Sequence, residues 1–222
     1  MSDKVFGFTL AEVLITLGVI GVVAAMTLPT VIRNYQKQQT VIKLKRAYNT
    51  MSNAIQMSKN VNGEVADWDI KFDDKLQDAS DFADKYLIPY MKVVKACKTN
   101  QSGDCIHRSK YIDGTSTGGA STTMTSFYTN DGILYILGNG TTGQGTISTN
   151  YNVIIDINGN KAPNTYGKDI FIFQLHLNSG TLKANFAASG KERIDEYCKN
   201  YGFSCAAKII NAGWKIENDY PW

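Results

Sequence analysis

The sequence predicts an α+β fold in which one long N-terminal helix packs on an antiparallel β-sheet. Three observations indicate this fold class. An apolar run extends from Phe8 to Leu28 with Glu12 as its single charge. An apolar stripe at helical spacing follows this run. The rest of the chain contains short apolar and aromatic runs separated by Asn, Asp and Gly, a pattern typical of antiparallel strands joined by tight turns.

The overall composition is that of an ordinary globular chain, with 222 residues, 43% apolar residues and 11% aromatic residues. These values disfavour a disordered or low-complexity protein. The net charge of +3 argues against a basic nucleic-acid-binding surface spread over the whole chain. The charge is uneven, because residues 58–222 contain 17 basic and 18 acidic residues. The C-terminal part of the chain is therefore almost neutral.

The apolar run is long enough to cross a bilayer, since a membrane-spanning helix needs about 20 apolar residues. It fits a cleaved secretory signal, a plain transmembrane anchor, or a segment in which Glu12 has a function. The small residues around Ala24 make only a weak signal-cleavage pattern. A carboxylate inside hydrocarbon costs about 2.5–3.5 kcal/mol on insertion scales. We therefore expect Glu12 to be a functional residue.

The N-terminal sequence resembles a known family. The segment Gly7-Phe8-Thr9-Leu10-Ala11-Glu12 is similar to the processing site of type IV prepilins and type II secretion pseudopilins. The short polar leader MSDKVFG ends in Gly7, Glu12 is the fifth residue counted from Phe8, and Pro29 lies near the end of the apolar run. The resemblance covers residues 1 to about 57 and implies a pilin-like fold.

The resemblance implies that a prepilin peptidase and methyltransferase cuts between Gly7 and Phe8 and methylates the new amine. Glu12 would then pair with the cationic Phe8 of a neighbouring subunit, because pairing offsets the cost of burying both charges. In the alternative, Glu12 only reaches to the membrane interface. The further partners implied are membrane lipid before assembly, other pilin or pseudopilin subunits and an inner-membrane assembly platform.

Four segments follow from this interpretation. Residues 1–7 form the leader, 8–29 the transmembrane and filament-core helix, 30–59 an amphipathic helical spine, and 60–222 a β-rich head. The spine carries an apolar stripe with gaps of three and four residues, at Val41, Leu44, Tyr48, Met51 and Ile55. We expect one helix from about residue 9 to residue 59, bent at Pro29.

The head is predicted to contain a short helix from Ser80 or Asp81 to Leu87, a meander of strands, and a C-terminal helix that begins at Cys205. The predicted strands are Met124–Thr129, Ile133–Leu137, Asn150–Ile157, Asp169–Leu177 and Thr181–Phe186. Alternation places Phe171, Phe173 and Leu175 on the face that covers the long helix. The segment Gly138–Gly143 is interpreted as a loop between strands.

The four cysteines allow three pairings. The local pairs Cys97–Cys105 and Cys198–Cys205 close short loops and suit an exported head in an oxidising space. Other pairings, free thiols and a zinc site remain as alternatives, although neither pair has the usual spacing of zinc ligands.

One loop contains oxygen-bearing side chains at a spacing that suggests a cation site. Asp156, Asn158 and Asn160 alternate around Gly159, and Asp169 follows, which resembles half of a calcium loop. The closing bidentate Glu is missing and Lys161 is near, so ordinary turn chemistry is the competing explanation. Calcium is the one cofactor that the sequence offers.

No catalytic constellation is predicted, because neither His107 nor His176 has a nucleophile or paired carboxylate at a useful spacing. The sequence therefore predicts a structural subunit of a type IV pilus or a type II secretion filament, not an enzyme. It would lie in the bacterial inner membrane as a single-pass protein with its head outside the cytoplasm, and then in a periplasmic or cell-surface filament. The alternative is an anchored or tip-located binding protein, such as an adhesin or a DNA-uptake subunit.

Overall fold

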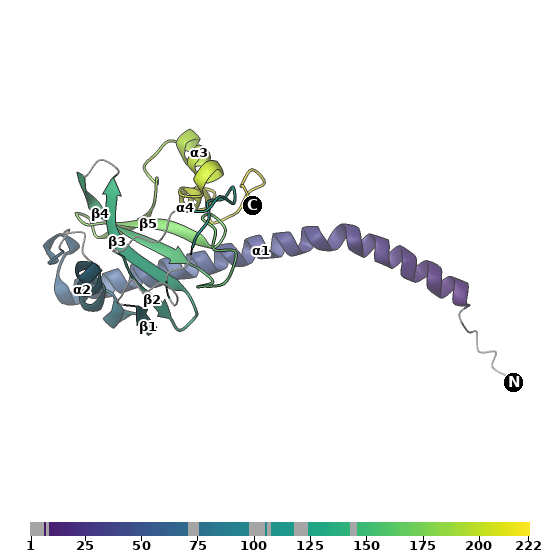
Figure 1. The fold of residues 1–222 in the computed structure, drawn as a ribbon, viewed down its shortest axis with the longest axis horizontal. Helices are drawn as coiled ribbons and strands as arrows, with labels where there is room; N and C mark the ends of the chain where they lie inside the picture. The colour runs from purple at the N-terminus through teal and green to yellow at the C-terminus, as the bar shows by residue number, and fades with distance from the viewer. Residues whose placement is uncertain are drawn as a thin grey trace. The chain divides into compact units, whose positions relative to one another are not determined.

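The computed structural model describes residues 7, 9–70, 76–97, 105, 108–117, 124–142 and 146–222 of the chain. The chain divides into two compact units, Met1–Gln39 and Thr40–Trp222. The first unit contains the N-terminal part of helix α1, and the second contains the rest of α1 and the sheet (Figure 1). We describe each unit by itself.

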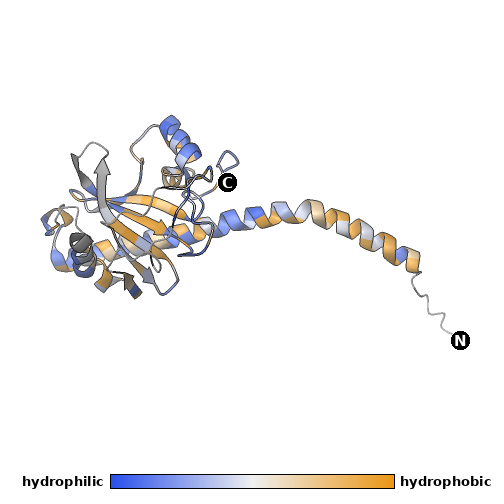
Figure 2. Ribbon diagram, in the orientation of Figure 1, coloured by the Kyte–Doolittle hydropathy of each residue, from blue (hydrophilic) through white to orange (hydrophobic). Residues whose placement is uncertain are grey.

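Helix α1 extends from Leu10 to Asn62, close to the predicted limits of 9 and 59. Pro29 lies inside the helix. In the first unit the large apolar side chains of α1 are exposed, for example Leu14 at 61% and Ile20 at 63%. Figure 2 shows the hydrophobic colour along this N-terminal part of α1. Among the described residues, α1 is the one helix long and apolar enough to cross a membrane, judged by length and composition.

The second unit is built on an antiparallel meander, as the turn spacing predicts, with six strands in place of the predicted five. The strands follow one another in the sheet in chain order. They are β1 (Val93–Cys97), β2 (Thr125–Thr129), β3 (Leu134–Thr142), β4 (Thr146–Asp156), β5 (Ile170–His176) and β6 (Thr181–Ala184). The predicted turns after β2, β4 and β5 contain Gly132, Gly159 and Gly180, each with a positive φ. Glycine adopts this conformation without steric cost. The short turns at Gly132 and Gly180 fix the register of their hairpins, whereas Gly159 lies in the longer connection between β4 and β5.

The core of the second unit lies between the sheet and α1. On the helix, Leu44, Met51 and Ile55 of the predicted stripe are fully buried. On the sheet, Phe171, Phe173 and Leu175 of β5 are buried on one face, as alternation predicts. The Tyr48 ring on α1 lies 5.5 Å from the Phe173 ring. The helix-on-sheet packing and the α+β, pilin-like fold class are therefore confirmed.

Shorter helices complete the described part of the second unit, namely α2 (Leu76–Tyr86), α3 (Lys191–Tyr201) and α4 (Cys205–Asn211), with 3-10 turns at Val65–Asp67 and Ile88–Tyr90. The predicted C-terminal helix is confirmed as α4. The helix predicted from Ser80 or Asp81 to Leu87 is α2, which begins earlier, at Leu76, and ends at Tyr86. Helix α3 was not predicted, since its eleven residues bury only Ile194 and Cys198.

The strand predictions need two corrections. Strand β1 was missed because it is an edge strand with mostly exposed side chains and no apolar alternation to reveal it. The loop predicted at Gly138–Gly143 was wrong for its first five residues, which continue β3. Backbone pairing with β4 explains this extension, since Gly138 pairs with Asn152 and Thr141 with Ile147. Residues 143–145 lie outside the described residues.

Candidate processing and assembly site

The N-terminus of α1 is built as a capping box. The backbone N–H and the hydroxyl of Thr9 both donate to Glu12 Oε2, each at 2.8 Å. The Glu12 backbone N–H donates in return to Thr9 Oγ1 at 3.3 Å. This reciprocal arrangement satisfies backbone donors that the first helical turn otherwise leaves unpaired. The Glu12 carboxylate is thereby fixed at the very start of α1.

The described residues around the predicted cleavage site are accessible. Glu12 and Thr9 are exposed, and so is Gly7. Phe8 lies outside the described residues, as do leader residues 1–6. A carboxylate in the first turn is also favoured by the positive end of the helix dipole. The signal for this capping box is the sequence Thr-x-x-Glu before an apolar run, which our sequence interpretation did not use.

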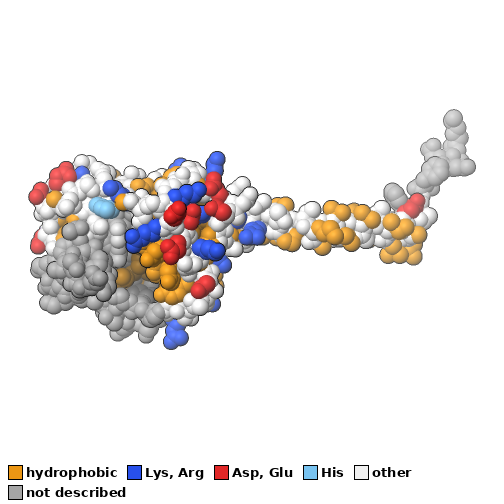
Figure 3. Space-filling model, turned by 90° about the horizontal axis from the view of Figure 1, so that it is seen from above, with side chains coloured by type: hydrophobic (Ala, Val, Ile, Leu, Met, Phe, Trp, Pro, Cys, Tyr) orange, Lys and Arg blue, Asp and Glu red, His pale blue; other side chains and the backbone are white. Residues whose placement is uncertain are grey.

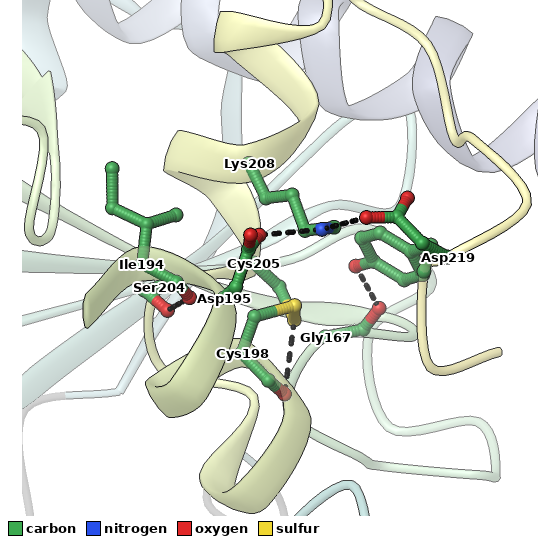
Figure 4. Close-up of a disulfide and its surroundings, with 9 residues drawn as sticks. Gly167, Ile194, Asp195, Cys198, Ser204, Cys205, Lys208 and Asp219 are labelled. Carbon is green, nitrogen blue, oxygen red and sulfur yellow. Dashed lines mark hydrogen bonds and ion pairs between the residues drawn. A yellow bond between two sulfur atoms is a disulfide. The ribbon is translucent and has the colours of Figure 1, made fainter. Parts of the chain in front are cut away.

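The structure joins Cys97 to Cys105 and Cys198 to Cys205. The second disulfide links α3 to α4 across the turn at Gly202 (Figure 4). Gly202 has a φ of +82°, and a Cβ there would collide with the Tyr166 carbonyl oxygen. Glycine is therefore needed at this turn, which brings both cysteines into a fully buried position.

Around this disulfide, a lysine binds two carboxylates. Lys208 Nζ on α4 lies 2.5 Å from Asp195 Oδ1 on α3 and 2.6 Å from Asp219 Oδ2 in the C-terminal tail (Figure 4). Burial lowers the pKa of the Lys208 ammonium, but its hydrogen bonds with both carboxylates outweigh burial and raise that pKa. The Tyr220 hydroxyl fixes the tail further by donating to the Gly167 carbonyl oxygen at 2.5 Å. The ion pairs and the disulfide thus bind α3, α4 and the tail together.

Replacing Lys208 with Met should destabilise this C-terminal assembly. The substitution keeps an unbranched side chain but leaves Asp195 and Asp219 without their shared cation. Because both carboxylates are partly exposed, we expect a loss of about 1–2 kcal/mol in the free energy of unfolding. Urea denaturation of the full chain in detergent measures this loss of unfolding free energy. Lys199→Met, on the exposed surface of α3, is the control, and an equal loss in both variants would contradict the prediction.

The structure brings together three of the four predicted calcium ligands. Asp156 Oδ1 accepts the Asn158 backbone N–H at 3.0 Å, and Asn158 Nδ2 donates to Asp169 Oδ2 at 3.2 Å. Asn160 is exposed. The Asp169 carboxylate also accepts the backbone N–H groups of Asn164 and Thr165. Burial raises the pKa of the Asp169 carboxyl group, although these hydrogen bonds counteract the rise.

These contacts fit a hydrogen-bonded turn, and calcium binding stays a prediction. Within the described residues, no group of three or more His, Cys, Asp and Glu side chains could hold a metal. In the same described part of the chain, the Oδ1 atoms of Asn158 and Asn164 are buried and accept no hydrogen bond. Asn164, with a φ of +51°, is therefore a better candidate ligand than Asn160, and the sequence spacing did not reveal it.

If calcium binds this loop, it will raise the stability of the head. At a free concentration 100 times the dissociation constant, a ligand specific for the folded state adds about 2.7 kcal/mol. Thermal unfolding with calcium chloride, compared with a chelator, measures the effect. Asp169→Asn should abolish the calcium-dependent part. An unchanged melting temperature in the unmodified chain would contradict calcium binding.

Of the two histidines, His176 lies in the described part of the chain. His176 lies half-buried on β5, where burial and then the nearby Lys183 lower the pKa of its imidazole. His107 lies outside the described residues.

Comparison with known proteins identifies two matches. A family model described as a family of unknown function (DUF6613) matches residues 30–222. A second model, the prokaryotic N-terminal methylation motif, matches residues 3–28 and includes Gly7, Phe8 and Glu12. No curated protein and no solved structure matches the chain. The chain therefore belongs to the family of unknown function DUF6613, and its N-terminus carries the methylation motif that is typical of type IV pilins and pseudopilins.

Proposed function

We propose that this protein is a structural subunit of a filament of the type IV pilus or type II secretion class. The methylation motif at residues 3–28, followed by one long apolar helix, is the observation that supports this proposal most directly. A prepilin peptidase removes the leader after Gly7 and methylates Phe8. The chain contributes structure to the filament, and partner proteins supply the energy for assembly.

Before assembly, the bilayer covers the apolar surface of α1. The exposed apolar side chains of Leu10–Leu28 would be unfavourable in water, at about 25 cal/mol per Å² of apolar surface. At about 1.5 Å per residue, this length of helix matches the hydrocarbon thickness of a membrane. The same surface is covered by the corresponding helices of other subunits after assembly. Membrane and filament are thus two environments for one apolar helix.

Assembly uses the carboxylate at the start of this helix. The capping box directs both donors of Thr9 to Oε2 of Glu12, and within the described residues nothing donates to Oε1. Oε1 can therefore accept the methylated amine of Phe8 from a neighbouring subunit without loss of the cap. A subunit out of register would leave two charges unpaired in an apolar bundle, which makes this contact selective for position.

The head is suited to an oxidising compartment. Its two disulfides would be reduced in most bacterial cytosols and persist in the periplasm or outside the cell. Each disulfide contributes on the order of 2–4 kcal/mol by restricting the unfolded chain. This chemistry agrees with an N-terminus in the cytoplasm and a head on the opposite side of the inner membrane.

Mass spectrometry of the mature N-terminus tests the proposal. In cells that contain a prepilin peptidase, we expect the chain to begin at an N-methylated Phe8. Gly7→Leu should block the cut and leave the full leader, whereas Lys4→Gln should not. A mature chain that begins near Thr27 would indicate ordinary signal-peptide cleavage and would overturn the proposal.

A further inference from the structure

Charged side chains of the first unit lie at the two ends of its apolar stretch. Glu12 lies in the first turn of α1, and Arg33 is the first basic residue after the apolar run. Between them, residues 13–32 carry no charged side chain. Figure 3 shows the hydrophobic side chains of this part of α1, with an acidic side chain at the N-terminal end and basic side chains at the other end.

The spacing of these two charged residues along α1 matches the thickness of a membrane. From Glu12 to Arg33 the helix rises about 31 Å, at about 1.5 Å per residue. The hydrocarbon core of a bilayer is about 30 Å thick. In the orientation proposed above, a helix with Glu12 at the cytoplasmic border of this core therefore has Arg33 at the exported border, among the lipid headgroups.

The residues that follow the apolar stretch are typical of a membrane–water interface. Tyr35 is 61% exposed, and tyrosine is enriched at the level of the headgroups because its ring is apolar and its hydroxyl group is polar. Lys37 is half-buried and lies one helical turn beyond Arg33, on the same ridge of α1. Helical side chains lean toward the N-terminus, which is the side of the bilayer here, so the Lys37 ammonium group also reaches the headgroups.

These cations lie on the side of the membrane where an excess of basic residues is unusual. Short segments on the cytoplasmic side usually carry more Lys and Arg than those on the exported side. In this chain the cytoplasmic leader carries Asp3 and Lys4, which give it no net side-chain charge. No acidic residue occurs in the sequence between Glu12 and Glu64, so the segment beyond the exported border is net positive. Anionic headgroups would neutralise this charge.

The other cations of α1 are less suited to a contact with lipid. Lys43 follows Arg33 by nearly three helical turns of about 3.6 residues, beyond the headgroup layer of about 5–8 Å. Within the second unit, Lys45 Nζ lies 5.7 Å from the centre of the Trp214 ring, and Arg46 Nε lies 3.1 Å from Asp131 Oδ2. Arg33 and Lys37 are therefore the cations of α1 that lie at the depth of the headgroups.

We propose that Arg33 and Lys37 bind the headgroups of anionic phospholipids in the exported leaflet of the membrane, before the subunit enters a filament. The guanidinium and ammonium groups donate charge-assisted hydrogen bonds to the phosphate oxygens, with Tyr35 at the same depth. This contact depends on the proposed insertion of α1 in a membrane, and it adds a preference for lipid charge. It also sets the depth of α1, because it fixes the exported end of a stretch whose cytoplasmic end carries Glu12.

Spin-labelled lipids test the proposal on the full chain, reconstituted in phosphatidylcholine vesicles. Electron paramagnetic resonance compares the association of the chain with spin-labelled phosphatidylglycerol and with spin-labelled phosphatidylcholine. We expect the chain to prefer phosphatidylglycerol at about 0.01 M salt, and the preference to weaken at about 1 M salt, where charges are screened within about 3 Å. Arg33→Gln and Lys37→Gln should each lower the preference by up to about fivefold, because each removes one cation from an anionic surface.

Two matched variants distinguish this contact from a general effect of charge. Arg33→Lys keeps the positive charge and should keep most of the lipid preference. A double variant, Lys191→Gln with Lys199→Gln, removes two exposed cations of α3 in the second unit and should leave the preference unchanged. Far-UV circular dichroism of the reconstituted variants confirms that α1 remains helical.

Two results would overturn the proposal. The first is equal association of the unmodified chain with both lipids. The second is a preference that persists in the Arg33→Gln, Lys37→Gln double variant, which would place the lipid contact elsewhere. Both cations follow the apolar stretch whether or not the leader has been removed. A negative lipid result therefore leaves the proposed cleavage after Gly7 intact, and an uncleaved N-terminus leaves the lipid measurement valid.

Discussion

Glu12→Gln should abolish incorporation of this protein into filaments while leaving cleavage after Gly7 intact. Glutamine still accepts the hydrogen bonds of a capping box, so the start of α1 keeps its geometry. The substitution removes only the negative charge. The methylated amine of Phe8 in a neighbouring subunit would then be buried without a counter-ion, at a cost of about 3–5 kcal/mol for each contact. Because one such contact recurs with every subunit, the loss accumulates along the filament.

Three variants distinguish the effect of the Glu12 charge on assembly from the effect of the capping box. Thr9→Val removes the hydroxyl and weakens the cap by about 1 kcal/mol, yet it keeps the Glu12 charge. We expect reduced but measurable assembly for Thr9→Val, and none for Glu12→Gln or Glu12→Ala. Sheared filament fractions, quantified with an antibody against the head, measure incorporation. Normal assembly of Glu12→Gln would show that the carboxylate acts only as a cap.

The sequence predicts those parts of the fold that depend on local periodicity. The spacing of Leu44, Met51 and Ile55 gives the buried face of α1, and the alternation around Phe173 gives the buried face of β5. Glycine-containing turns between them give the antiparallel meander. In each case the signal lies within a few residues of the element that it specifies.

Parts of the fold that depend on distant contacts were not predictable in this way. Strand β1 exists because β2 pairs with it, and the extension of β3 through Gly138 exists because β4 runs alongside. Helix α3 has almost no apolar stripe, and the Cys198–Cys205 disulfide and Lys208 fasten it to α4. Only a folded chain reveals such partners.

The candidate sites show the same difference between features that the local sequence predicts and features that depend on distant contacts. Gly7, Phe8 and Glu12 form a short linear motif that a sequence displays completely. The capping box is also a local motif, because Thr9 and Glu12 are three residues apart. The ring contacts of Tyr111 and Tyr166 with Phe203 join distant parts of the chain, and no spacing in the sequence predicts them.

Phe173→Ala should produce the largest loss of stability in the head. The side chain is fully buried on β5, flanked by Val153 on β4 and Ala184 on β6, and it contacts Tyr48 on α1. Truncation would leave a cavity where the sheet meets the helix. Replacements of this kind cost about 3–5 kcal/mol, which is a large part of the 5–15 kcal/mol that stabilises a typical domain.

Ile172→Ala is the matched control, because Ile172 is the next residue on β5 and points to the opposite, half-buried face. Its truncation removes part of the apolar surface without opening the helix–sheet core, so we expect a loss of about 1 kcal/mol. Urea denaturation followed by near-ultraviolet circular dichroism of the aromatic residues measures both variants. Equal losses would mean that the opposite face of the sheet is packed as tightly as the face on α1. A much larger loss for Phe173→Ala would identify the contact between β5 and α1 as the main source of stability in the head, and would explain why the amphipathic half of α1 folds with the sheet.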